Sequence, residues 1–80
     1  MDKWICFQSL QDARKFFEIV DSVPEAVYLC ADGGEKEIRS MMDMFCFDLK
    51  KPLRMHIASD EEDAGQIMEM LRDYIVEEGN

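Results

Sequence analysis

The sequence predicts a small α+β domain whose elements follow one another in the order β-α-β-β-α-β-α. Segments with alternating polarity, segments with apolar residues at helical spacing, and a pair of glycines directly after one alternating segment indicate this class. The chain has 80 residues, of which 48% are hydrophobic, with only four Gly and two Pro, as in packed globular proteins. Because so short a chain can enclose only one modest core, we expect a single domain over residues 1–80.

The first strand and the first helix are expected near the N-terminus. Trp4 to Phe7 is a run of aromatic and β-branched residues that ends in a polar stretch, which predicts a short strand. Ser9 is placed to cap a helix, and Asp12 falls in its first turn, where a negative charge favours the helix dipole. The helix ends before Pro24, and its apolar stripe consists of Leu10, Ala13, Phe16, Phe17 and Val20.

A hairpin and a short helix are expected in the middle of the chain. Glu25 to Ala31 alternates in polarity, as a strand with one buried face requires. Asp32-Gly33-Gly34 then supplies a tight turn, so a polar strand from Glu35 to Arg39 should return beside it. Ser40 is placed to cap a short helix that runs to about Cys46, with an apolar surface formed by Met41, Met42, Met44 and Phe45.

The last strand and the last helix complete the expected order. Leu53 to Ile57 alternates after the Lys51-Pro52 turn and predicts the fourth strand. The acidic run from Asp60 to Asp63 is typical of a helix start, and it lacks the spacing of a calcium loop. The apolar positions of this helix are Ala64, Ile67, Met68, Leu71 and Ile75, and the final Glu77–Asn80 is expected to fray.

Charge and cysteine usage argue against several classes of function. The net charge of -9 comes from 18 acidic and 9 basic residues, without a concentrated basic cluster, so neither nucleic acid nor an anionic membrane is an expected partner. Cys6, Cys30 and Cys46 stand singly, which predicts packing residues in a reducing compartment and no metal or cofactor. Without a signal peptide or an apolar run of about 20 residues, the protein is expected to be cytoplasmic.

One segment and the element order resemble a known family. Arg39-Ser40-Met41-Met42-Asp43-Met44-Phe45 is similar to the basic-Ser-apolar-Met-Gly-apolar-Met segment of HPr, the histidine-containing phosphocarrier protein of the bacterial sugar phosphotransferase system. Ser40 falls on the serine that is phosphorylated in Gram-positive members, and the pattern extends without a gap from Ser9 to the end. The resemblance implies an open-faced β-sandwich, with a four-stranded antiparallel sheet of order 1-4-2-3 and three helices on one face.

The chain departs from the HPr pattern where that family carries phosphate. The loop G-L-H-[AT]-R-P-A should stand at Phe7 to Ala13, but Ser9 falls near the histidine, Gln11 near the arginine, and Asp12 at the proline. Phosphohistidine chemistry needs the imidazole and nearby donors, so we expect no enzymatic phosphotransfer; Ser9 is interpreted as a helix cap. Asp43 replaces the glycine of the Ser40 segment and would repel a phosphate on that serine.

The sheet face away from the helices is the expected contact surface. His56 alternates out of phase with Met55 and Ile57, so it should lie on this face as a surface or interface histidine rather than a catalytic one. In the HPr strand order, other side chains should line up beside it, and an exposed apolar surface of this kind marks a contact site. The expected interface residues are Trp4, Tyr28, Cys30, Arg54 and His56, with Cys6 beyond Trp4.

Three hypotheses for function follow from these observations. The first is a non-catalytic HPr-like protein that acts through protein-protein contact, either as a regulatory or binding module or as a homodimer through the open sheet face. The second is a component of the phosphotransferase system that is regulated or docks through Ser40 without histidine phosphotransfer. The third, an unrelated ligand-binding α+β domain, would need a pocket that 80 residues can scarcely enclose.

Overall fold

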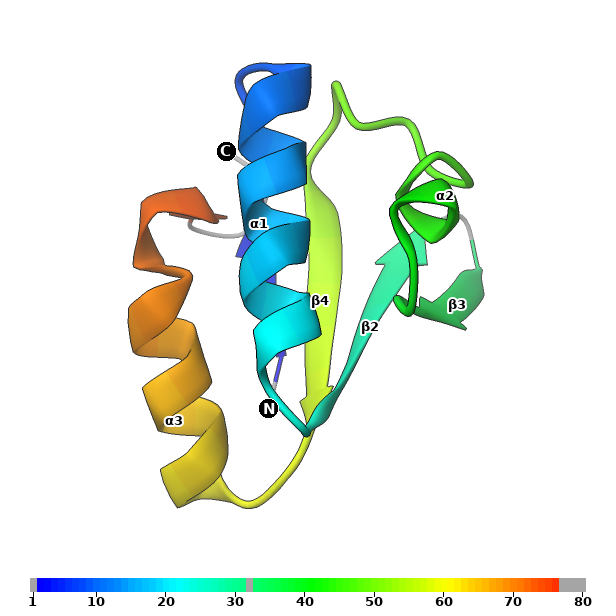
Figure 1. Cartoon of the computed structure of the whole chain (residues 1–80). Coiled ribbons are helices and arrows are strands. Elements are labelled where there is room, and N and C mark those ends of the chain that lie inside the picture. Colours follow the sequence, from blue (N-terminus) through cyan, green and yellow to red (C-terminus); the bar gives the residue numbers. More distant parts are fainter. Residues whose placement is uncertain (1, 32, 77–80) are drawn as a thin grey trace.

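The protein is an open antiparallel sheet packed against helices, as a computed structural model shows for residues 2–31 and 33–76. Figure 1 shows α1 and α3 on the same side of the sheet, with α2 near β2 and β3. The α+β class and the three helices are therefore confirmed. The elements are β1 (Asp2–Ile5), α1 (Leu10–Ser22), β2 (Ala26–Ala31), β3 (Gly34–Glu37), α2 (Met41–Met44), β4 (Leu53–Ala58), α3 (Glu61–Met70), the 3-10 helix η1 (Arg72–Tyr74) and β5 (Ile75–Val76).

The sheet has five strands within the described residues, in the order β3-β2-β4-β1-β5. The expectation of four strands in the order 1-4-2-3 is therefore wrong, because β5 lies beyond β1. β5 pairs antiparallel with β1, with Trp4 opposite Val76 and Ile5 opposite Ile75. Ile75 and Val76 are β-branched and suit this position, where they extend the sheet past a strand that would otherwise form its edge.

The first strand begins and ends earlier than the expected Trp4 to Phe7. β1 spans Asp2–Ile5, and its register with β4 runs from Asp2 opposite His56 to Ile5 opposite Leu53. After β1, the Cys6 N–H donates to the Tyr74 carbonyl at 2.8 Å. Phe7 therefore leaves the strand, and its ring is buried among aromatic neighbours instead of lying in the sheet.

The first helix agrees with its expected limits. α1 begins after Ser9, whose side chain accepts a hydrogen bond from the Asp12 N–H at 3.2 Å, and it ends at Ser22, before Pro24. The Asp12 carboxylate in turn accepts from the Gln8 N–H at 3.2 Å. These two bonds satisfy amides at the start of the helix that have no partner within it.

The last helix is shorter than the sequence predicts. α3 begins after Asp60, whose side chain accepts from the Asp63 N–H at 2.9 Å, but it ends at Met70 instead of continuing through Ile75. The Leu71 N–H is shared by the carbonyls of Ile67 and Met68, and the chain tightens into η1 before it enters β5. The turn residue Asp32 and the end Glu77–Asn80 lie outside the described residues.

The hydrophobic core fills the space between the helices and one face of the sheet. Alternate residues of β2 and β4 are buried there, and α1, α2 and α3 contribute apolar side chains from the other side. No polar or charged residue among those described is buried. The buried residues include Ile5, Ala13, Phe16, Val20, Val27, Leu29, Ile38, Met44, Leu53, Met55, Ile57, Ala64, Ile67, Met68 and Leu71.

Candidate functional site: the open sheet face

The side of the sheet away from the core, called here the open sheet face, collects the expected interface residues. Strand register places directly opposed side chains on the same face. One row across the strands therefore runs Trp4, Arg54, Cys30, Glu35, and the next runs Asp2, His56, Tyr28, Glu37. All five expected residues, Trp4, Tyr28, Cys30, Arg54 and His56, lie in these two rows, whereas Cys6 follows the end of β1.

A charged cluster occupies the middle of this face. The Asp2 carboxylate lies 2.6 Å from His56 Nδ1 and 3.4 Å from Arg54 Nε. The hydrogen bond with His56, reinforced by the charge of Arg54, lowers the pKa of Asp2 below its usual value. These contacts join β1 to β4, and they place a carboxylate beside the imidazole that the sequence alone had left without a partner.

Tyr28 and Trp4 flank the charged cluster on either side. The Tyr28 ring lies 6.0 Å from the His56 ring, measured between centroids. Trp4 sits between Arg54 of β4 and Val76 of β5 in the strand register. Both aromatic residues are half-buried, so part of each ring remains accessible to solvent. Trp, Tyr and Arg are the residue types that most often supply the binding energy of protein interfaces.

Cys30 is held as a neutral thiol on this face. Its Sγ donates to Glu35 Oε2 at 3.4 Å. Burial raises the pKa of the Cys30 thiol, and the hydrogen bond and negative charge of Glu35 raise it further. A reactive cysteine needs the opposite environment, one that stabilises the thiolate. The arrangement therefore gives Cys30 the chemistry of a contact residue instead of a nucleophile.

The two serines singled out from the sequence begin helices and are not part of the open sheet face. Ser9 caps α1, and Ser40 is exposed at the start of α2. The Asp43 carboxylate accepts from the N–H groups of Arg39 at 2.8 Å and Ser40 at 2.9 Å, and these bonds lower the pKa of Asp43. A phosphate on Ser40 would meet this charge and compete for the same amides.

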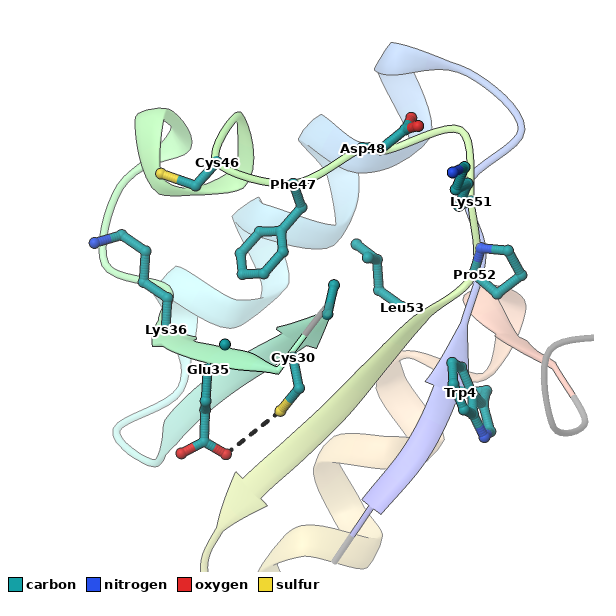
Figure 2. A pocket seen from close by; sticks show the side chains of 12 residues that line it. Trp4, Cys30, Glu35, Lys36, Cys46, Phe47, Asp48, Lys51, Pro52 and Leu53 are labelled. Carbon is teal, nitrogen blue, oxygen red and sulfur yellow. Dashed lines mark hydrogen bonds between the residues drawn. The ribbon is translucent and has the colours of Figure 1, made fainter.

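An open groove lies where the sheet meets the loop between α2 and β4. Its volume is about 580 Å³. Trp4, Cys30 and Glu35 of the open sheet face line it, together with loop residues that include Phe47 and Asp48. Figure 2 shows the Phe47 ring directed from the loop toward the sheet, with Leu53 between it and Trp4. We call this feature the end groove. No local pattern of residues predicted it, because the position of the loop depends on tertiary packing.

Asp2 and Glu35 are the site residues that sequence reasoning missed. Asp2 lies two residues before Trp4, and Glu35 lies two residues before Glu37, the partner of Tyr28 on the neighbouring strand. Side chains two residues apart in a strand point to the same face, so alternation would have placed both on the open sheet face. Asp2 was overlooked because the first strand was expected to begin at Trp4. Its contacts with His56 and Arg54 depend on a register that only the paired strands reveal.

Comparisons with known proteins do not supply a relative. No protein-family model matches the chain, and no curated protein or solved structure shows significant similarity to it. Within residues 2–31 and 33–76, no helix has the length and apolar character needed to cross a membrane. Over the same residues, no three or more His, Cys, Asp or Glu side chains are grouped as metal ligands would be.

Proposed function

We propose that this chain is a non-catalytic, HPr-like protein that acts through protein-protein contact, either as a regulatory or binding module or as a homodimer. The contact surface is the open sheet face. The observation that carries the proposal is the presence of Trp4 and Tyr28, both half-buried, on a sheet face that the core-forming helices do not cover. Partly exposed aromatic rings on a sheet lose further solvent contact when a partner binds.

The centre of the face also supports docking. The Asp2, Arg54 and His56 cluster is already paired within the chain, so a partner can cover it without leaving an isolated charge. The aromatic side chains on either side provide anchors, and a central anchor contributes about 2 kcal/mol or more in typical interfaces. The neutral thiol of Cys30 adds weakly polar surface next to Tyr28, two residues along β2.

The proposal is tested by removing both aromatic anchors. The Trp4→Ala, Tyr28→Ala double variant is compared with the wild type by sedimentation over a range of concentrations, and in binding to any partner that co-purifies with the wild type. We expect association to weaken at least about thirtyfold, which is the effect of losing one anchor of about 2 kcal/mol, because the losses of two anchors in one interface do not add in full. Circular dichroism establishes that the variant is folded.

A matched control removes apolar side chains from the helical side. Met42 and Phe45 are 79% and 57% exposed at α2, so the Met42→Ala, Phe45→Ala double variant deletes comparable apolar surface elsewhere. It should associate as the wild type does. The proposal is wrong if the wild type stays monomeric at high concentration and the Trp4, Tyr28 variant binds an identified partner equally well.

The rival function, regulation or docking through Ser40, has a separate test. Asp43 already occupies the Arg39 and Ser40 amides, which argues against a phosphate at this helix start. Incubation with an HPr serine kinase and ATP should therefore leave the intact mass unchanged. Stoichiometric phosphate on Ser40 would favour the rival instead.

A further inference from the structure

We propose that the end groove binds a basic segment of the partner, with an apolar side chain seated in the groove and a Lys or Arg paired with its carboxylates. This inference rests on the proposed function, because the groove continues the open sheet face. Trp4, Cys30 and Glu35 belong to both surfaces. A partner that covers the face therefore reaches the groove without a second docking event.

The walls of the groove suit an apolar anchor. Phe47 is half-buried and its ring faces the sheet, while Leu53 forms the base between Phe47 and Trp4 (Figure 2). Pro52 and Ala31 add further apolar surface. A pocket of about 580 Å³ is large enough for one bulky side chain together with its neighbouring backbone.

The charges that line the groove favour a cationic occupant. Among the described residues, the Glu35 carboxylate accepts a hydrogen bond only from the neutral Cys30 thiol, and the Asp48 carboxylate accepts only from the Lys50 N–H, at 3.0 Å. Neither carboxylate has an ion-pair partner among the described residues. Of the two lysines that line the groove, Lys36 is already paired, because its Nζ lies 3.6 Å from a carboxylate oxygen of Asp43 in α2. Among the described residues that line the groove, two carboxylates, those of Glu35 and Asp48, therefore lack an ion-pair partner, against one such cation, the Lys51 ammonium.

The net charge of the whole chain also favours a basic partner. The net charge of -9 attracts a basic segment and repels an acidic one at distances up to the screening length. Within the groove, the exposed part of the Trp4 ring can also accept a cation over its face. Charge alone would recruit a basic segment to any acidic surface, such as the start of α3; the apolar walls are what distinguish the groove.

The test uses the full chain, labelled with ¹⁵N, and three blocked octapeptides in buffer of physiological salt. One peptide alternates Leu and Arg, the second replaces Arg with Glu, and the third replaces Leu with Ser. We expect the Leu-Arg peptide to bind most tightly and to shift the Trp4 indole resonance and the amides of Cys30, Phe47 and Leu53. Tighter binding of the Leu-Glu peptide, or no groove shifts with the Leu-Arg peptide, would overturn the proposal.

Two charge-matched variants separate a specific site from general attraction. Glu35→Gln with Asp48→Asn removes the groove carboxylates and should weaken the Leu-Arg peptide about three- to tenfold, the range expected for two partly exposed ion pairs. Glu61→Gln with Glu62→Gln removes the same charge from α3, where both residues are exposed, and should change affinity less than twofold. Equal weakening in both variants would show that the groove is not the site.

The two proposals fail in different ways. If the Trp4→Ala, Tyr28→Ala variant loses association but the groove variant keeps full partner affinity, the open sheet face is the interface and the groove inference is wrong. If the Leu-Arg peptide occupies the groove while that aromatic double variant associates normally, the proposed function is wrong and the groove binds independently of it.

Discussion

The substitution Phe16→Ala tests the aromatic centre of the core. The Phe16 side chain is fully buried, and its ring lies 5.1 Å from Phe7 and 5.9 Å from Tyr74, edge to face with both. These contacts join α1 to the chain after β1 and to η1. Truncation of a buried Phe costs about 3–5 kcal/mol in the free energy of unfolding, because it loses hydrophobic transfer energy and leaves a cavity.

A loss of this size is a large fraction of the total for a chain of this length. At about 0.05–0.15 kcal/mol per residue, 80 residues correspond to roughly 4–12 kcal/mol. With a urea slope near the low end of its range, about 1 kcal/mol/M, the unfolding midpoint should fall by about 3 M or more, or the variant should be largely unfolded in buffer.

Phe45→Ala provides the control, since it is the same substitution at a side chain that is 57% exposed. Its effect should stay within about 1 kcal/mol, because little apolar surface leaves the core. Both variants are measured by urea unfolding followed by circular dichroism. Equal destabilisation of the two would refute the packing argument, as would a Phe16→Ala variant that unfolds at the wild-type midpoint.

Three further predictions concern glycines, pH and the thiol. Gly65→Ala should stabilise the protein by about 0.5–1 kcal/mol, because Gly65 lies in α3 and an added methyl group meets open space there. Gly33→Ala should destabilise the protein, because the φ of Gly33 is +79°. Thermal unfolding should show a raised midpoint for the first variant and a lowered midpoint for the second. Because the pKa of Asp2 is lower in the folded protein than its ordinary value of 3.8, the ionised carboxylate stabilises the fold above that pH, and this stabilisation is lost as the pH falls through the folded pKa. The wild type should therefore lose more stability than Asp2→Asn on acidification below about pH 4. Parallel plots of unfolding free energy against pH for the two proteins would contradict this. Glu35→Gln should speed alkylation of Cys30 by iodoacetamide at pH 8, since Glu35 raises the pKa of that thiol; peptide mass spectrometry measures the rate, and an unchanged rate would exclude the effect.

The sequence predicted the elements whose signals are local. The Ser9 cap, the helical stripe and Pro24 together located α1, because capping and apolar spacing act within a few residues. Alternation likewise located β2 and β4 to within a residue at each end. Alternation also placed His56 out of phase with its buried neighbours, and the structure has it half-buried on the open sheet face.

The predictions for the end of α3 and the limits of β1 were wrong because the local sequence allows two interpretations of the same residues. Ile75 continues the apolar spacing of α3, yet it is also β-branched and suits a strand. The choice depends on β1, whose edge offers hydrogen bonds only after the sheet has formed. The limits of β1 depend in the same way on its register with β4, which brings Asp2 into the sheet and releases Phe7 into the core.

The sequence by itself determined the α+β class, the helix starts and the alternation that separates the two faces of each strand, because caps and periodicity are properties of neighbouring residues. Only the tertiary structure decided the fifth strand, the Asp2 contacts with His56 and Arg54, and the end groove. Each of these joins segments that are distant in the chain. Their geometry depends on strand register and on loop packing over the core, which no local pattern encodes.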